Sequence, residues 1–161
     1  MSERIIGIGE IAVSDNSEEI IKTYALGSCV AVIVYDHDSG IGGMVHISLS
    51  DSKISQNKDN PGHFADSGID EMLLKIMNLN ENIDFEIMDV YIVGGAKMMQ
   101  GDSFFNIGEN NIKKVKSILK GKKMKIKSED LGKDISRTVS LDIFDGRVIV
   151  SNMKIGKWLL T

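Results

Sequence analysis

Three residue types near the start of the chain have a spacing that could support nucleophilic chemistry. Cys29 is the only cysteine, and Gly27 and Ser28 directly precede it. Thr23 lies shortly before Cys29, and His46 follows it. An imidazole that takes the proton of a thiol turns that thiol into a competent nucleophile at neutral pH. A lone cysteine is also often a small buried hydrophobe, so its neighbours must decide between catalysis and packing.

Two predicted strands determine whether the histidine can reach the cysteine. Val30–Tyr35 is rich in β-formers, and the turn residues that follow it end at Gly40. Ile41–Leu49 is the expected partner strand of a hairpin. If 36–39 form the loop, Tyr35 faces Gly40. Counting back along both strands then places Cys29 directly opposite His46, with Cβ atoms about 5 Å apart.

The same hairpin gives Thr23 and the Gly-Ser pair possible roles. Thr23 has the same parity as Cys29, so its hydroxyl or carbonyl group could orient the imidazole of His46. A register that differs by one residue would send the cysteine and the histidine to opposite faces. Gly27 and Ser28 are small enough to let a substrate approach the backbone, and the N–H groups of Ser28 and Cys29 could stabilise an oxyanion. A tight turn that enters a core strand would explain this pair equally well.

The rest of the chain predicts two helices and further short strands. Apolar residues recur at helical spacing at Ile69, Met72, Leu73, Ile76 and Met77. Asp66 or Ser67 is expected to cap this helix. The second helix carries Ile112, Val115, Ile118 and Leu119 and is expected to end at Gly121. Strands are predicted at Val90–Val93, Met124–Lys127, Arg137–Phe144 and Arg147–Val150, the last two joined by an Asp145-Gly146 turn.

About seven strands with two helices predict a mixed α and β fold, in which β-sheets form a layered sandwich with two or three helices outside. The 161 residues contain no proline-rich linker and no internal repeat, so we expect a single domain over 1–161. The polar stretch 51–60 is a candidate mobile loop.

Composition excludes several function classes. The chain has 19 basic and 23 acidic residues, a net charge of -4, and its basic residues concentrate only at Lys113–Lys127. This balance argues against nucleic-acid binding. We expect a soluble cytoplasmic protein, because a single cysteine forms no internal disulfide, the first residues do not resemble a signal peptide, and no apolar run is long enough to span a membrane.

No cofactor or metal is expected. His37 lies in a polar turn and should be exposed to solvent, and a metal site built from His37, Asp36 and Asp38 matches no familiar ligand spacing. His63 is expected to have a capping or loop role. Gly94–Lys97 could cradle a phosphate but lacks the spacing of a P-loop.

Motifs along almost the whole chain resemble the CheD family, the chemoreceptor glutamine deamidases of bacterial and archaeal chemotaxis. They are Gly7–Ser14, Leu26–Val32, Gly42–His46, Phe64–Asp66, Gly94–Met98, Ile107–Asn111, Asp130–Gly132 and Asp145-Gly146. The resemblance implies that Cys29 is the nucleophile, His46 its base and Thr23 the third member of the site. It also implies a fold similar to the cysteine deamidase domain of bacterial toxins.

The resemblance further implies partners. The substrate would be the cytoplasmic helices of chemoreceptors, and a CheC-type phosphatase would act as regulator. Phe104 and Phe105 form a paired aromatic in an expected loop and could dock a partner, although core packing would also explain them. Two other functions stay open: a non-catalytic adaptor that binds receptors or a CheC-type phosphatase, and a hydrolase of receptor methyl esters.

Overall fold

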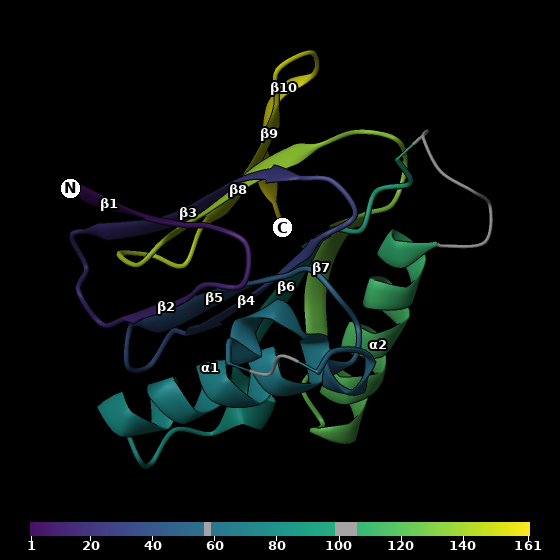
Figure 1. Cartoon of the computed structure of the whole chain (residues 1–161). Coiled ribbons are helices and arrows are strands. Elements are labelled where there is room, and N and C mark those ends of the chain that lie inside the picture. Colours follow the sequence, from purple (N-terminus) through teal and green to yellow (C-terminus); the bar gives the residue numbers. More distant parts are fainter. Residues whose placement is uncertain (57–58, 99–105) are drawn as a thin grey trace.

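Two five-stranded β-sheets pack face to face, and the helices lie outside one of them (Figure 1). The computed structural model describes residues 1–56, 59–98 and 106–161. The sheet without helices, here the outer sheet, has the strand order β1 (Ser2–Ile6), β3 (Glu19–Leu26), β8 (Arg137–Asp142), β9 (Val148–Asn152) and β10 (Gly156–Leu160). The central sheet has the order β2 (Ile11–Ser14), β5 (Ile41–Ile47), β4 (Val30–Asp36), β6 (Asp89–Gly94) and β7 (Ile126–Leu131).

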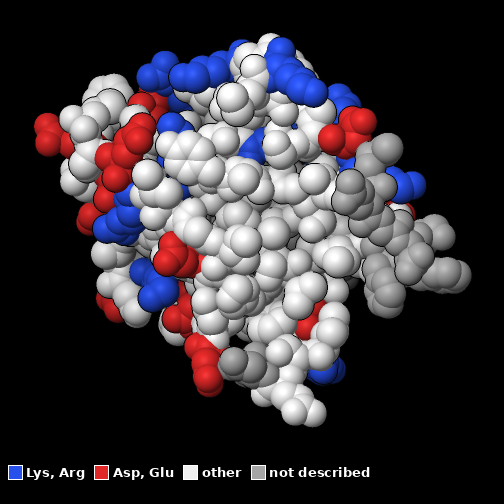
Figure 2. Space-filling model, turned by 45° about the horizontal axis from the view of Figure 1, so that its top comes forward, with Lys and Arg blue, Asp and Glu red and all other residues white. Residues whose placement is uncertain are grey.

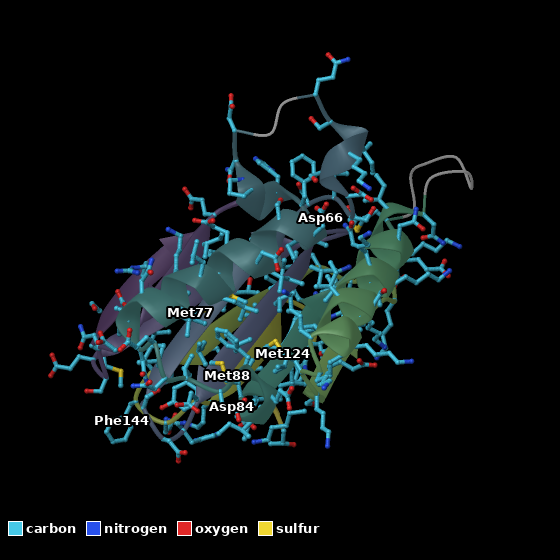
Figure 3. All side chains as sticks on the ribbon, turned by 90° about the horizontal axis from the view of Figure 1, so that it is seen from below. Asp66, Met77, Asp84, Met88, Met124 and Phe144 are labelled. Carbon is cyan, nitrogen blue, oxygen red and sulfur yellow. The ribbon has the colours of Figure 1, made fainter. Side chains whose placement is uncertain are left out.

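Two α-helices in the described part of the chain cover the central sheet. They are α1 (Ala65–Leu79) and α2 (Ile107–Gly121), and Figure 3 looks onto them from the helical side. Short 3-10 turns occupy Ser52–Ile54, Pro61–His63 and Phe85–Ile87. Within the described residues, none of the helices has the length and apolar character needed to cross a membrane.

The alternation of side chains along β4 builds two cores. Val30, Val32 and Val34 face the helices and join the cluster formed by α1 and α2. Ala31 and Ile33 face the outer sheet and pack in a second cluster between the sheets. Because both faces of β4 are covered, the strand is apolar throughout, as its sequence pattern predicted.

The layered sandwich, the Asp145-Gly146 hairpin and the end of α2 at Gly121 are confirmed. The likeness to toxin deamidases stays a prediction. The expected number of about seven strands was wrong, because ten are present within the described residues: β1, β2, β3 and β10 had not been predicted. Three of these, β1, β2 and β10, lie at sheet edges. A short strand at an edge is only partly buried, so its alternation of apolar and polar residues is weak.

The expected start of α1 was also wrong. Phe64 is its N-cap residue and provides no side-chain cap. The Asp66 carboxylate instead accepts hydrogen bonds from the backbone and hydroxyl of Ser52, which fixes the preceding 3-10 turn against the helix. Met77 was expected in the core but is 43% exposed. Figure 3 labels both Asp66 and Met77 along α1.

Charges of both signs occupy the surface. On the face shown in Figure 2, Lys and Arg side chains gather along the upper edge, Asp and Glu mainly at the left, and uncharged residues over the middle. Charges of both signs therefore lie on this face.

Candidate active site

The predicted pairing of Cys29 with His46 was wrong, because the observed register of the two strands is displaced by two residues. In the β4–β5 hairpin, Ala31 pairs with His46 and Tyr35 pairs with Gly42. The reason is that Asp36 stays in the ladder, so the loop begins one residue later than expected. The partner of each β4 residue is therefore displaced by two positions, which leaves every side chain on its predicted face.

The side chain of Asp36 explains the later start of the turn. Its carboxylate accepts hydrogen bonds from the backbone N–H and the hydroxyl of Ser39, and the Gly40 N–H donates to its carbonyl. Gly40 has φ +68°, a left-handed conformation that glycine adopts at little cost. The turn is thus closed around Asp36, and its position in the sequence follows from side-chain bonds that periodicity does not predict.

Cys29 and His46 face the same space between the two sheets. Cys29 precedes Ala31 by two positions, and its carbonyl accepts a hydrogen bond of 2.8 Å from the Gly95 N–H, which continues the β4–β6 pairing beyond the end of β4. A residue two positions from a direct partner is a diagonal neighbour, about 7–8 Å away between Cα atoms. Cys29 also packs against the apolar cluster between the sheets. The thiol is therefore at the edge of the layer in which the imidazole of His46 is buried.

Thr23 fixes the tautomer of His46. The Thr23 hydroxyl lies 2.7 Å from the carbonyl oxygen of Ile6 and 2.7 Å from Nδ1 of His46. The carbonyl can only accept, so the single hydroxyl proton goes to Ile6 and the oxygen accepts from Nδ1–H. Nε2 is then the unprotonated nitrogen of a neutral ring. It is buried and has no hydrogen-bond partner among the described residues.

Burial keeps both groups neutral. Burial, and then the electrostatic effect of the nearby His63, lower the pKa of His46 from its ordinary value of 6.5 to about 4. Burial raises the pKa of the Cys29 thiol, and hydrogen bonding to its own backbone N–H opposes this to a smaller extent. At neutral pH the site therefore holds a thiol and an imidazole that can accept its proton, not a thiolate–imidazolium pair.

Backbone bonds hold the loop that carries Cys29. The Ala96 N–H donates to the Gly27 carbonyl, next to the bond between Gly95 and Cys29. Gly94 has φ +116°, and a Cβ placed on it would lie 2.3 Å from the Cys29 carbonyl oxygen. Only glycine fits this position. The segment Gly94–Lys97, which lacks the spacing of a P-loop, thus forms a backbone support for the cysteine loop.

Comparison with known proteins assigns the chain to a family. A family model described as CheD chemotactic sensory transduction matches residues 48–152. A protein of Syntrophotalea carbinolica named probable chemoreceptor glutamine deamidase CheD is 43% identical over 160 residues, which cover 98% of this chain and 99% of that protein. A protein of Methanosarcina acetivorans named probable chemoreceptor glutamine deamidase CheD 1 is 37% identical and covers 92% of this chain, with 91% of its own length matched. The chain belongs to the CheD family.

His37 and the phenylalanine pair were also considered in this CheD protein from its sequence. His37 is exposed, as expected, and its Nε2 lies within hydrogen-bond distance, 2.6 Å, of a carboxylate oxygen of Asp89, a contact that was not predicted. No cluster of three or more possible metal ligands occurs in the described parts of the chain. Phe104 and Phe105 lie outside the described residues, so their role stays a prediction.

Two polar residues near the CheD site were missed or misread from the sequence. His63 does lie in a short helical turn, but its ring also contacts the Ser48 hydroxyl at 3.1 Å and lowers the pKa of His46. Asn111 is buried in α2, and its amide reaches two backbone carbonyls near the site. The only signal for Asn111 was its place in the motif Ile107–Asn111, which named no contact.

Proposed function

We propose that this CheD protein hydrolyses the side-chain amide of specific glutamines on the cytoplasmic helices of chemoreceptors, leaving glutamate. The observation that carries the proposal is the bond between Thr23 and His46, which leaves Nε2 of a neutral imidazole free on the face that Cys29 shares. The substrate class is supported by the relatives, which are named probable chemoreceptor glutamine deamidases.

The chemistry proceeds by nucleophilic substitution at the carboxamide. The sulfur of Cys29 attacks the amide carbon while its proton passes to Nε2 of His46. The C–N bond then breaks, and the imidazolium gives its proton to the departing ammonia, which leaves a thioester. Water attacks the thioester with His46 again as base, so that glutamate and the free thiol result. Thr23 keeps Nδ1 protonated and the ring oriented throughout, as a third group does in other triads.

Proton transfer occurs during attack and not before it. The pKa of the thiol is raised and that of the imidazole is lowered, so the neutral pair is the resting state. Nε2 has no hydrogen-bond partner in the described residues, so the Cys29 side chain must turn toward it when the sulfur attacks an electrophile. Catalytic hydrogen bonds that are long or absent without substrate commonly form in the complex.

The backbone before the nucleophile supplies the oxyanion site. The Ser28 N–H has no acceptor and the Cys29 N–H interacts only with the cysteine's own sulfur among the described residues, whereas the carbonyls of Gly27, Ser28 and Cys29 are bonded. Free N–H groups beside a nucleophile can stabilise the charge that develops on the amide oxygen. Gly27 adds no side chain that would block the approach of a glutamine.

We also propose that a CheC-type phosphatase regulates the protein by competing with the receptor for the same face. A cytoplasmic location is proposed as well. Both rest on membership of the CheD family. Phe104 and Phe105 are the predicted docking residues. Their replacement with Ala should weaken partner binding without unfolding the protein, and a loss of stability alone would make them core residues.

The test compares amide and ester substrates. A receptor cytoplasmic fragment with glutamine at its modification sites, and the same fragment carrying methyl esters, are incubated with the protein and with its His46→Ala variant. Release of ammonia by the wild type, far faster than release of methanol, is expected, and the variant should lose it. Methanol release alone would replace the proposal with ester hydrolysis, and binding without either product would replace it with an adaptor function.

A further inference from the structure

One buried side chain in α2 bonds to both segments that carry the proposed catalytic residues. Asn111 is 1% exposed. Its amide nitrogen lies 3.1 Å from the carbonyl oxygen of Ser28, the residue before Cys29. The same nitrogen lies 3.0 Å from the carbonyl oxygen of Ser48, two residues after His46. Two carbonyl acceptors fix which end of the amide is the nitrogen, because its oxygen would be repelled by both.

The packing of α2 makes this reach possible. Gly108 lies on the same face of the helix, one turn before Asn111. A Cβ on Gly108 would lie 2.6 Å from the carbonyl oxygens of Gly95 and Ala96. The absence of a side chain therefore lets the start of α2 approach the backbone that supports the cysteine loop, and this approach brings Asn111 to the carbonyl of Ser28.

The bond to Ser28 also orients the N–H of Cys29. The peptide between these residues is trans, because no cis peptide bond is present in the described residues, so its C=O and N–H point in opposite directions. Holding the carbonyl toward α2 turns the N–H away from the helix. This N–H is one of the two donors assigned above to the oxyanion site, and it also interacts with the cysteine sulfur.

The amide oxygen of Asn111 indicates a role beyond stabilising the fold. Oδ1 of Asn111 is buried and has no hydrogen-bond partner among the described residues. A buried acceptor without a donor is unfavourable and rare in folded proteins. A residue selected only for stability would not leave a buried acceptor without a donor. A residue that is needed for its two N–H donors can keep such an acceptor.

We propose that Asn111 is a positioning residue of the deamidase, which holds the Ser28–Cys29 peptide and the segment after His46 at a fixed separation. The inference rests on the proposed function for its role in turnover. Asn111 contacts no reacting atom. It acts through the carbonyls of Ser28 and Ser48. Its loss should therefore separate the Cys29 thiol from the His46 imidazole, although both of these residues are still present.

Turnover provides the first test. Asn111→Ala should lower kcat on a receptor fragment about a hundredfold, the order expected when a reacting group is misplaced by about 1 Å, with little change in KM. Asn110→Ala removes an exposed amide from the same helix and should leave both constants unchanged. Val115→Ala opens a buried position one turn later, in the helical core, and controls for loss of stability. An equal loss of kcat in the Val115 and Asn111 variants would contradict the positioning role.

A double-mutant cycle on thiol reactivity provides the second test and needs no receptor. The rate at which iodoacetamide alkylates Cys29 at neutral pH is measured with and without the His46→Ala change, in the wild type and in the Asn111→Ala and Val115→Ala backgrounds. The loss of His46 should slow alkylation about tenfold or more in the wild type and in Val115→Ala, but hardly at all in Asn111→Ala.

The two measurements separate the two proposals. If the His46 effect is the same size in the Asn111→Ala background as in the wild type, the positioning role is refuted. If the cycle gives the expected result but the wild type converts no receptor glutamine, the proposed function fails and the positioning of the thiol stands. Should Asn111→Ala not fold, Asn111→Ser is used in the same cycle, since its shorter side chain loses the reach to both carbonyls but leaves a smaller space.

Discussion

The buried neutral imidazole of His46 should make the protein sensitive to mild acid. The pKa of His46 is about 4 in the folded chain and near 6.5 when unfolded. The unfolded state therefore binds a proton first as the pH falls, and stability that is fully present above pH 6.5 is lost toward pH 4. One pKa unit corresponds to 1.36 kcal/mol. Between pH 7 and 4.5 the free energy of unfolding should fall by about 2–2.5 kcal/mol from this group alone.

Urea denaturation measures this loss directly. Unfolding is followed by the fluorescence of Trp158, the only tryptophan, from pH 7.5 to 4.5, in the wild type and in His46→Asn. Asparagine retains a donor for the Thr23 hydroxyl but does not titrate. Carboxylates contribute the same pH dependence to both proteins, so the difference between the curves isolates the imidazole. Curves that stay parallel within about 0.5 kcal/mol would refute a buried, neutral His46.

Three further changes test the site. Thr23→Val removes the hydroxyl that orients His46 and should lower kcat about tenfold to a hundredfold, whereas Thr23→Ser should restore most of it; equal activity of both variants in a deamidation assay would contradict the role of the hydroxyl. Gly94→Ala should lower the melting temperature, because it forces a side chain into a left-handed backbone and against a carbonyl, while Gly121→Ala meets open space and should not. His63→Ala removes the electrostatic effect of His63 on His46, so the pKa of His46 rises. Since kcat/KM requires the neutral ring, its fall in acid should move to higher pH, and an unchanged pH profile would exclude the interaction.

Local patterns predicted the parts of the fold that periodicity controls. The apolar run of β4 and the helical spacing in α1 and α2 predicted these elements and the end of α2 at Gly121, although the start of α1 was missed. The register of the β4–β5 hairpin was missed because it depends on the bonds that Asp36 makes to its own turn. The predicted grouping of Cys29 with His46 still survived, since the displacement by two positions conserved the face of each side chain.

Long-range contacts account for what the sequence did not predict at the site. Thr23 was placed near His46 by parity and by family resemblance, but its bond to the Ile6 carbonyl depends on the parallel pairing of β1 with β3, for which no local pattern exists. The two carbonyl contacts of Asn111 join α2 to the loops after β3 and β5. Contacts between such distant segments are set by packing, which a single sequence does not reveal.

Cys29 is proposed to be the nucleophile in the hydrolysis of a receptor glutamine. The most direct measurement incubates a receptor cytoplasmic fragment with the wild type or with Cys29→Ala in water enriched in oxygen-18, and maps each modified residue by peptide mass spectrometry. We predict glutamate carrying one heavy oxygen at specific former glutamine positions with the wild type, and none with the variant. Equal conversion by the two proteins, or none by either while the receptor stays bound, would contradict the account.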